Sequence, residues 1–316
     1  MVRKIALEEH FLSPGLVDYW RPTMTEVPAP LVDNLYRRLT DFDDLRLETM
    51  DKAGIAKAVL SVSGPGVQAE RDPAVATRKA REANDFLAEQ IARHPDRYAG
   101  FAHVAVQDAG GAARELARCV QELGFKGAMI NGHTNGLYLD DRSLDAFWEA
   151  AEALGALVYI HPTDPLVPAP ALNGVPALRR ATWEWGFETG SHALRLVFSG
   201  LFDRFPKAKV GLGHMGETLP YLLWRFDSRA KLYNVTLGKE PSQYIKDNIV
   251  VTVSGVYARE PLMCAVEALG RDKVMFAADY PFESAEEAGH FMDDVAIPED
   301  LRAAVAYDNA ARLLGL

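Results

Sequence analysis

The sequence predicts a (β/α)8 barrel, the TIM-barrel fold, as a single domain over residues 1–316. Short aliphatic runs alternate with amphipathic helical segments, and there are eight such runs. Each run is almost continuously hydrophobic, as in parallel strands covered on both faces. A doubly wound open sheet is the competing fold, but no glycine-rich phosphate-binding loop follows any run, which removes the usual nucleotide-binding form of that competitor.

The expected strands are the aliphatic runs, and the expected helices lie between them. Strands are predicted at residues 4–10, 56–64, 98–106, 127–132, 157–162, 209–216, 249–255 and 274–281. Helices are predicted at about residues 43–53, 73–94, 112–123, 144–154, 192–205, 261–269 and 299–314. Asp72 before Pro73 is a helix-start signal, and Gly54 is a helix-end signal. The connections 11–40 and 162–180 are long, and in a barrel both follow the carboxyl ends of strands, where substrate-covering loops lie.

Composition and charge narrow the class of partner. The net charge of −10 repels phosphate backbones and anionic lipid, so we expect neither nucleic acid nor a membrane surface. No apolar run reaches the ~18 residues of a membrane span, and no signal-peptide region precedes the first strand, so a cytoplasmic location is predicted. Cys119 and Cys264 have no C-x-x-C partner, which indicates buried packing residues. A small molecule is therefore the expected ligand.

The first strand, KIALEEH, carries two adjacent glutamates and a histidine. Because side chains alternate along a strand, Ala6, Glu8 and His10 share one face, and Ile5, Leu7 and Glu9 share the other. Placing the large aliphatics against the helix layer puts Ala6, Glu8 and His10 on the barrel axis and leaves Glu9 facing outward. Glu8 and His10 then lie at the carboxyl end of the strand, where barrel enzymes keep their chemistry.

Three other strands end in polar groups that would meet this pair. His161 closes the fifth strand, His214 the sixth and Asp279 the eighth. Each histidine taken alone is more readily interpreted as a hydrogen-bonded structural residue. The set converges with two carboxylates on one rim, which favours a metal site.

The order and spacing of several motifs resemble a known family. ALEEH, the HP after the fifth strand, FSGLFDRFP, GHMGE and ADYPFE together resemble the metal-dependent decarboxylases of the amidohydrolase superfamily, especially the γ-resorcylate and 2,3-dihydroxybenzoate decarboxylases. The resemblance runs from the first strand to the closing NAARLLGL segment. It implies one divalent metal ion, Mn²⁺ or Zn²⁺, held by Glu8, His10, His161 and Asp279. E-x-H replaces the H-x-H of the hydrolytic members, and Asn131 and Gly132 end the fourth strand without a lysine for a bridging carbamate, so one metal is expected.

The resemblance also implies roles for residues around the metal. It makes His214 and Glu217 a polar pair that contacts and orients substrate or water, although a plain helix N-terminus is the alternative interpretation. It assigns substrate binding to Arg225, Phe282 and Trp20. A surface salt bridge is the competing interpretation for Arg225, and loop packing is the competing interpretation for Trp20.

The function implied by the resemblance is nonoxidative decarboxylation of an ortho-hydroxylated aromatic acid of the dihydroxybenzoate or salicylate type, reversible in principle. Asp279 is then the proton donor to the ring carbon, and this role needs a raised carboxyl pKa. The first alternative is a metal-dependent lactone or amide hydrolase of the same fold, and the second is a noncatalytic small-molecule binder. A homodimer or homotetramer is expected by analogy with the relatives.

Overall fold

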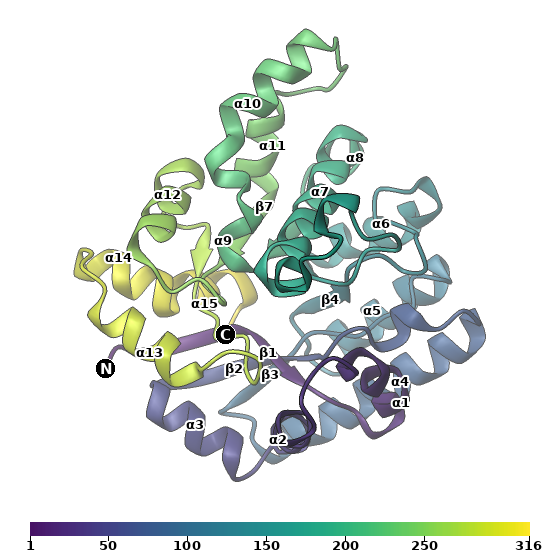
Figure 1. Cartoon of the computed structure of the whole chain (residues 1–316). Helices are drawn as coiled ribbons and strands as arrows, with labels where there is room; N and C mark the ends of the chain where they lie inside the picture. The colour runs from purple at the N-terminus through teal and green to yellow at the C-terminus, as the bar shows by residue number, and fades with distance from the viewer.

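Eight parallel strands form the barrel in the computed structural model, which describes residues 1–316 (Figure 1). The strands are β1 (Lys4–Phe11), β2 (Ile55–Val62), β3 (Tyr98–Gly100), β4 (Gly127–Asn131), β5 (Leu157–His161), β6 (Lys209–Leu212), β7 (Ile249–Thr252) and β8 (Val274–Met275). They pair in sequence order as β1-β2-β3 and as β4 through β8. Parallel bridges between Ala102 and Ala128 and between Glu9 and Tyr280 join the two sheets at both edges. The predicted barrel is confirmed.

Helices surround the strands on the outside of the barrel (Figure 1). They are α1 (Val17–Trp20), α2 (Ala29–Thr40), α3 (Leu45–Ala53), α4 (Pro73–Arg93), α5 (Ala109–Gln121), α6 (Asp145–Leu154), α7 (Glu184–Phe198), α8 (Leu201–Arg204), α9 (His214–Glu217), α10 (Leu219–Leu232), α11 (Pro241–Asn248), α12 (Arg259–Leu269), α13 (Ala285–Asp294), α14 (Glu299–Ala303) and α15 (Asn309–Leu314). The local signals act as expected: the Asp72 side chain accepts the N–H groups of Ala74 and Val75, and Gly54 ends α3 at φ 70°. No helix has both the length and the apolar character needed to cross a membrane.

Several element bounds differ from those the sequence predicts. Strands β3, β6 and β8 end several residues earlier than expected, because the chain leaves the sheet to form the rim of the barrel. The helix predicted at 192–205 begins at Glu184, and Gly200 at φ 69° separates its last turn as α8. The closing helix contains a π-helical turn at residues 304–308. Helices α1, α2, α11 and α13 were not expected.

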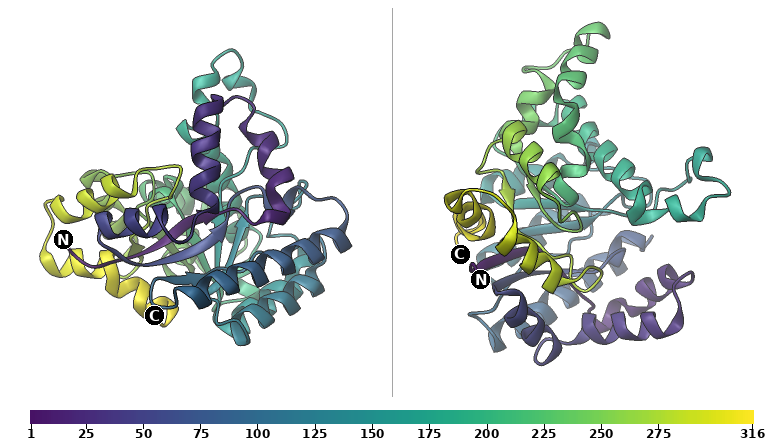
Figure 2. Two further views of the ribbon diagram at one scale, coloured as in Figure 1. Left: turned by 90° about the horizontal axis from the view of Figure 1, so that it is seen from below. Right: turned by 60° about the vertical axis from the view of Figure 1, so that its left-hand side comes forward.

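The two long connections project from the same end of the molecule (Figure 2). The first contains α1 and α2, so much of this long connection is helical. The second contains only short 3-10 turns between Pro162 and α7. Arg180 ties them together, since its guanidinium donates to the carbonyl of Thr23 at 2.8 Å and to Asp164 at 3.1 Å.

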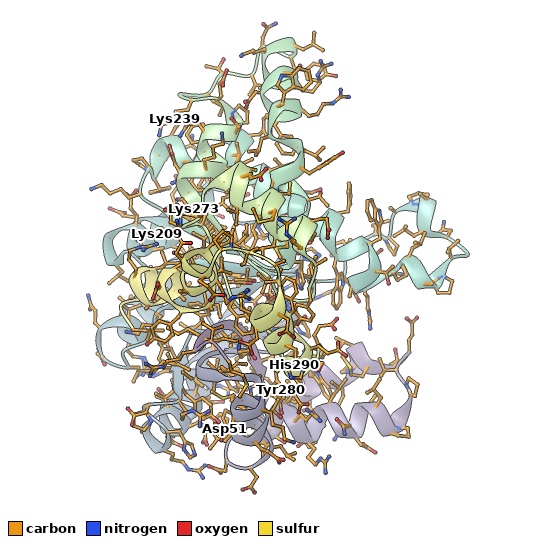
Figure 3. The ribbon with its side chains drawn as sticks, turned by 90° about the vertical axis from the view of Figure 1, so that its left-hand side faces the viewer. Asp51, Lys209, Lys239, Lys273, Tyr280 and His290 are labelled. Atoms are coloured by element: carbon orange, nitrogen blue, oxygen red, sulfur yellow. The ribbon has the colours of Figure 1, made fainter.

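The face of β1 that fills the barrel differs from the prediction. Ile5 and Leu7 pack with side chains of other strands, including Tyr159, whereas Ala6 packs in the larger cluster shared with the helices. Figure 3 shows side chains filling the space between the ribbons. The cause is a register shift: Ala6 pairs with Ala58, but Glu9 pairs with Leu60. The shift turns both Leu7 and Glu8 inward, so Glu8 and His10 reach the expected face although Ala6 does not.

Candidate metal centre and active site

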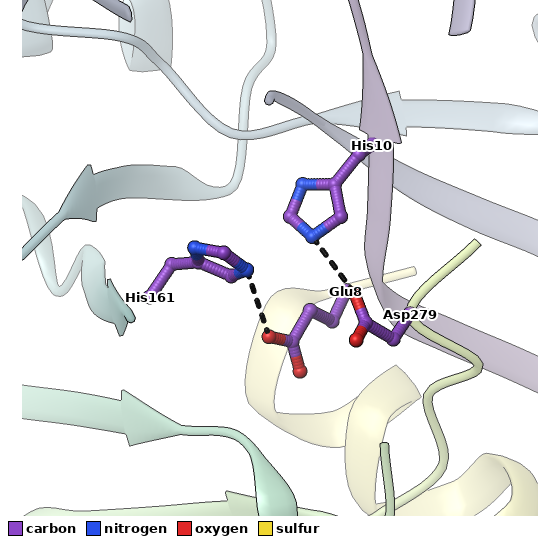
Figure 4. A group of neighbouring side chains, drawn as sticks. All are labelled: Glu8, His10, His161 and Asp279. Carbon is purple, nitrogen blue, oxygen red and sulfur yellow. Dashed lines mark hydrogen bonds and ion pairs between the residues drawn. The ribbon is translucent and has the colours of Figure 1, made fainter. Parts of the chain in front are cut away.

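Four side chains meet at the carboxyl end of the barrel. Glu8 and His10 come from β1, His161 ends β5, and Asp279 follows β8, and one ligand atom from each lies within 4.8 Å of the others (Figure 4). All four are buried, and Glu8 and His10 are fully so. His10 Nε2 lies 3.1 Å from Asp279 Oδ1, and His161 Nε2 lies 3.7 Å from Glu8 Oε1. The structure therefore brings together the four residues expected to hold a metal.

The two oxygens of Glu8 have different surroundings. Oε2 accepts hydrogen bonds from the hydroxyls of Tyr159, at 2.7 Å, and Ser254. Oε1 is buried and has no hydrogen-bond partner in the chain. A buried carboxylate oxygen without a partner is costly. A divalent cation between Glu8 and the other three side chains would remove that cost, so the donor set fits a metal ion.

The histidine tautomers also fit a metal. His161 Nδ1 lies 3.0 Å from the Pro162 carbonyl, which can only accept, so Nδ1 carries the proton and Nε2 presents its lone pair to the cluster. Burial and the charge of His10 lower the pKa of His161 well below its ordinary value, which keeps the imidazole neutral. Mixed nitrogen and carboxylate ligation of this kind is suited to Mn²⁺ and Zn²⁺.

Asp279 is held in an unusual backbone conformation. Its φ is 56°, in the left-handed region that non-glycine residues rarely adopt. The N–H of the preceding Ala278 donates to Glu9 Oε1 at 2.8 Å, so the outward-facing glutamate anchors this segment. Burial alone raises the pKa of Asp279, but interactions with His10 and His214 outweigh burial and hold that pKa below its usual range. In the chain without a metal, the pKa of Asp279 is thus lower than the proton-donor role needs.

His214 and Glu217 form a pair beside the cluster. His214 Nδ1 lies 2.7 Å from Glu217 Oε1, and His214 Nε2 lies 3.8 Å from Asp279 Oδ2 and 4.0 Å from Glu8 Oε1. Burial lowers the pKa of His214, but the charges of Glu217 and Glu8 outweigh it and raise that pKa well above its ordinary value. The residues from His214 to Thr218 have positive φ and form a left-handed turn. Helix α10 begins directly after the turn, at Leu219, so Glu217 also lies close to a helix N-terminus, as in the alternative interpretation.

Comparison with known proteins assigns this chain to a family. A family model described as amidohydrolase matches residues 31–316. The chain belongs to the amidohydrolase family. It is 42% identical to a γ-resorcylate decarboxylase of Polaromonas sp. (strain JS666), over 99% of this chain and 98% of that protein. It is 40% identical to a γ-resorcylate decarboxylase of Rhodococcus jostii (strain RHA1), over 100% of this chain and 99% of that protein.

Solved structures resemble this amidohydrolase over its whole length. A 2,6-dihydroxybenzoate decarboxylase in complex with 2,6-dihydroxybenzoate has a TM-score of 0.94 and 38% identity, and the similarity covers 100% of both chains. A dihydroxybenzoic acid decarboxylase from Polaromonas sp. JS666, with bound manganese and the inhibitor 2-nitroresorcinol, has a TM-score of 0.94 and 41% identity over 100% of this chain and 98% of that one.

The residues expected to bind substrate have different positions in the amidohydrolase barrel. The Phe282 ring lies 5.6 Å from that of His10, which places it beside the cluster. Trp20 is buried against Tyr36, and its indole N–H has no partner. Arg225 is exposed on α10 and makes no hydrogen bond or ion pair within the chain. The contacts of Phe282 fit its expected place, whereas those of Arg225 do not connect it to the cluster.

Sequence reasoning missed the hydroxyl groups beneath the cluster. Tyr159, Thr252 and Ser254 all lie within 3.4 Å of Glu8 Oε2. The signal was present in the run IVVTVSG, where Thr252 ends β7 and Ser254, two residues later, continues the same alternation. Tyr159 stands two residues before His161 and shares its face for the same reason.

Proposed function

We propose that this amidohydrolase is a divalent-metal-dependent decarboxylase of an ortho-hydroxylated aromatic carboxylic acid, with 2,6-dihydroxybenzoate the first candidate substrate. The observation that carries the proposal is the buried Glu8–His10–His161–Asp279 cluster, with its unpartnered Glu8 oxygen, in a chain 42% identical over nearly its full length to a γ-resorcylate decarboxylase. Mn²⁺ is the first candidate metal because it is bound in the similar Polaromonas structure, and Zn²⁺ is the second.

Each proposed role follows from the position of a side chain. Glu8, His10, His161 and Asp279 would hold the cation, which supplies Lewis-acid polarisation of the ortho oxygen and the carboxylate of the substrate. Phe282 would form one wall for the aromatic ring. Trp20 and Arg225 stay proposed substrate contacts. For Arg225, this role requires the substrate or a second subunit to extend to its exposed position on α10.

The proton is the demanding part of the reaction. Asp279 would deliver it to the ring carbon that bears the carboxylate. The bond from that carbon to the carboxylate then breaks, its electron pair returns to the ring, and CO₂ leaves. Because the pKa of Asp279 is low and that of His214 is raised, His214 would supply the proton through Asp279, and Glu217 would orient the imidazole. Carboxylation at high bicarbonate is the reverse of these steps.

The test is a substrate screen on purified protein with defined metal. The chain is stripped with a chelator, reloaded with Mn²⁺ or Zn²⁺, and assayed with 2,6-dihydroxybenzoate, 2,3-dihydroxybenzoate, salicylate and 5-carboxyvanillate by loss of ultraviolet absorbance and release of CO₂. We expect activity only with metal and its loss in Asp279→Asn. Full activity of Asp279→Asn would contradict the mechanism. Release of a ring-opened acid instead of CO₂ would indicate the hydrolase alternative, and ligand binding by metal-free protein without turnover would indicate the noncatalytic binder.

We also propose that the chain is a single domain that assembles as a homodimer or homotetramer in the cytoplasm. Support for assembly comes from large apolar side chains on the projecting helix α10, where Tyr221 is 81% exposed and Trp224 is 76% exposed. Trp183 and Phe187, near the start of α7, are also exposed. Light scattering on the purified protein should give a mass of two or four chains, and Tyr221→Ser with Trp224→Ser should lower it.

A further inference from the structure

Three hydroxyl groups surround one oxygen of Glu8. The Tyr159 hydroxyl donates to Oε2 at 2.7 Å, the Ser254 hydroxyl also donates to it, and Thr252 Oγ1 lies 3.4 Å away. Tyr159 and Thr252 are 2.8 Å apart, and Thr252 and Ser254 are 3.0 Å apart, so the hydroxyls form one chain. All of them are fully buried. No water is needed to satisfy Oε2.

Gly213, directly after β6, lies against the carboxylate on the other side. A Cβ atom at Gly213 would lie 2.7 Å from Glu8 Oε2 and 3.0 Å from Oε1, so the carboxylate occupies the space that any larger residue would fill. Gly213 leaves room for this carboxylate position, and the hydroxyls hold Oε2 in it. Oε1 alone faces the cluster, 3.7 Å from His161 Nε2.

Because only one oxygen of Glu8 faces the cluster, more coordination positions of a bound metal stay free. Each of the four clustered side chains offers one ligand atom. A cation such as Mn²⁺ takes about six ligands, which leaves about two. A carboxylate that bound through both oxygens would occupy one of those two, and only one would remain.

We propose that Tyr159 and Ser254 are positioning residues that restrict Glu8 to one-atom ligation and so keep two positions open for the paired oxygens of an ortho-hydroxy acid. This inference rests on the proposed function for the identity of the substrate. Hydrogen-bonded support around a metal ligand commonly raises metal affinity. Here the hydroxyls have a different purpose, because they hold one oxygen away from the metal.

Ser254 has a second contact that Tyr159 lacks. Its Oγ accepts the backbone N–H of His214 at 3.2 Å. One hydroxyl therefore fixes both a proposed metal ligand and the start of the left-handed turn. Loss of the Tyr159 hydroxyl should affect Glu8 and Thr252 but not His214, whereas loss of the Ser254 hydroxyl should also disturb His214.

The experiment counts exchangeable water on bound Mn²⁺. Purified full-length protein is stripped, reloaded with Mn²⁺ and examined by water-proton relaxation, with affinity from an electron paramagnetic resonance titration. We expect about two fast-exchanging waters in the wild type. Tyr159→Phe with Ser254→Ala should lose about one of them while binding Mn²⁺ as tightly or more tightly, and KM for the aromatic acid should rise about tenfold. Ser63→Ala, which removes a buried hydroxyl at the end of β2, should change neither the water count nor the Mn²⁺ affinity. Ser254→Thr should retain the wild-type water count.

Two results would overturn the inference. One is an unchanged water count in the double variant, and the other is weaker Mn²⁺ binding at an unchanged count, which a merely structural role predicts. If the double variant does not fold, Tyr159→Phe alone decides the question by the same count. The water count tests the inference separately from the proposed function. If wild-type protein binds Mn²⁺ with two waters but releases no CO₂, the proposed function is refuted. The water count of the double variant still decides the inference in that case.

Discussion

His214 Nδ1 lies 2.7 Å from Glu217 Oε1 across a turn whose residues, from His214 to Thr218, all have left-handed backbone. Left-handed conformation costs a non-glycine residue about 1–2 kcal/mol, so the surrounding structure must hold the turn in place. The contacts that do so include the His214 N–H bond to Ser254 and the close approach of Gly216 to Val251. This strained turn at the edge of the cluster holds His214 with its Nε2 directed toward Asp279.

Replacing Glu217 should change the pH dependence of the reaction. The charge of Glu217 helps to raise the pKa of His214, so Glu217→Gln lowers that pKa. Because the proposed step needs protonated His214, the alkaline limb of the kcat/KM profile should move to lower pH, with a loss of about 100-fold on that limb. Glu188→Gln, a buried glutamate on α7 that bonds Tyr138 instead, should keep the wild-type profile. An unshifted limb in Glu217→Gln would remove His214 from the proton path.

Replacing each of the two adjacent glutamates of β1 in turn should have different effects on the metal content of the protein. Glu8 faces the cluster, whereas Glu9 accepts the N–H of Ala278. Glu8→Gln should lose stoichiometric Mn²⁺ after dialysis, measured by inductively coupled plasma mass spectrometry. Glu9→Gln should keep it, because an amide oxygen can still accept that N–H. The opposite pattern would show that the register of β1 is wrong.

A methyl group at Gly213 should disturb the cluster without unfolding the barrel. A Cβ there would lie 2.7 Å from Glu8 Oε2, so Glu8 must move. Gly213→Ala should weaken Mn²⁺ binding about tenfold or more, measured by titration, with an unchanged circular dichroism spectrum. Gly15→Ala is the matched control, because its Cβ would meet nothing closer than 3.8 Å. Equal affinity in the two variants would contradict the fixed position of Glu8.

Two buried histidines should make the fold sensitive to acid. Burial lowers the pKa values of His103 and His192 to about 3, and Nε2 of each accepts a backbone N–H, which requires the neutral ring. Between pH 6.5 and about 3 the unfolded chain binds these protons and the folded chain does not, so stability is lost as pH falls. Each histidine contributes a slope of about 1.4 kcal/mol per pH unit within that window.

The histidine prediction is checked with urea midpoints between pH 7.5 and 4.5. His192→Gln retains an acceptor for the Leu139 N–H and should make the decline with falling pH less steep. His290→Gln should not, because His290 is exposed (Figure 3). An identical decline in wild type and His192→Gln would show that His192 is not held neutral.

Much of the candidate site follows from local sequence. Alternation over Glu8, Glu9 and His10 separates Glu9 from the other two, but the register shift is what turns Glu8 and His10 toward the cluster. The polar ends of β5 and β8 indicated His161 and Asp279. The barrel itself followed from the order of the apolar runs, because a nearly continuous hydrophobic strand followed by an amphipathic helix is stable only when both faces of the sheet are covered.

What the sequence could not determine depends on contacts between segments far apart in the chain. The register shift between Ala6 and Glu9 exists because β2 lies beside β1, and it reversed the predicted direction of Ala6. The unpartnered Oε1 of Glu8 depends on Tyr159 and Ser254, which lie more than 150 residues away. Sequence alone therefore determined the fold and the chemical types at the site, because periodicity is local. Only the tertiary structure decided the register, the hydrogen bonds and the charges around each group, because these arise from packing between strands.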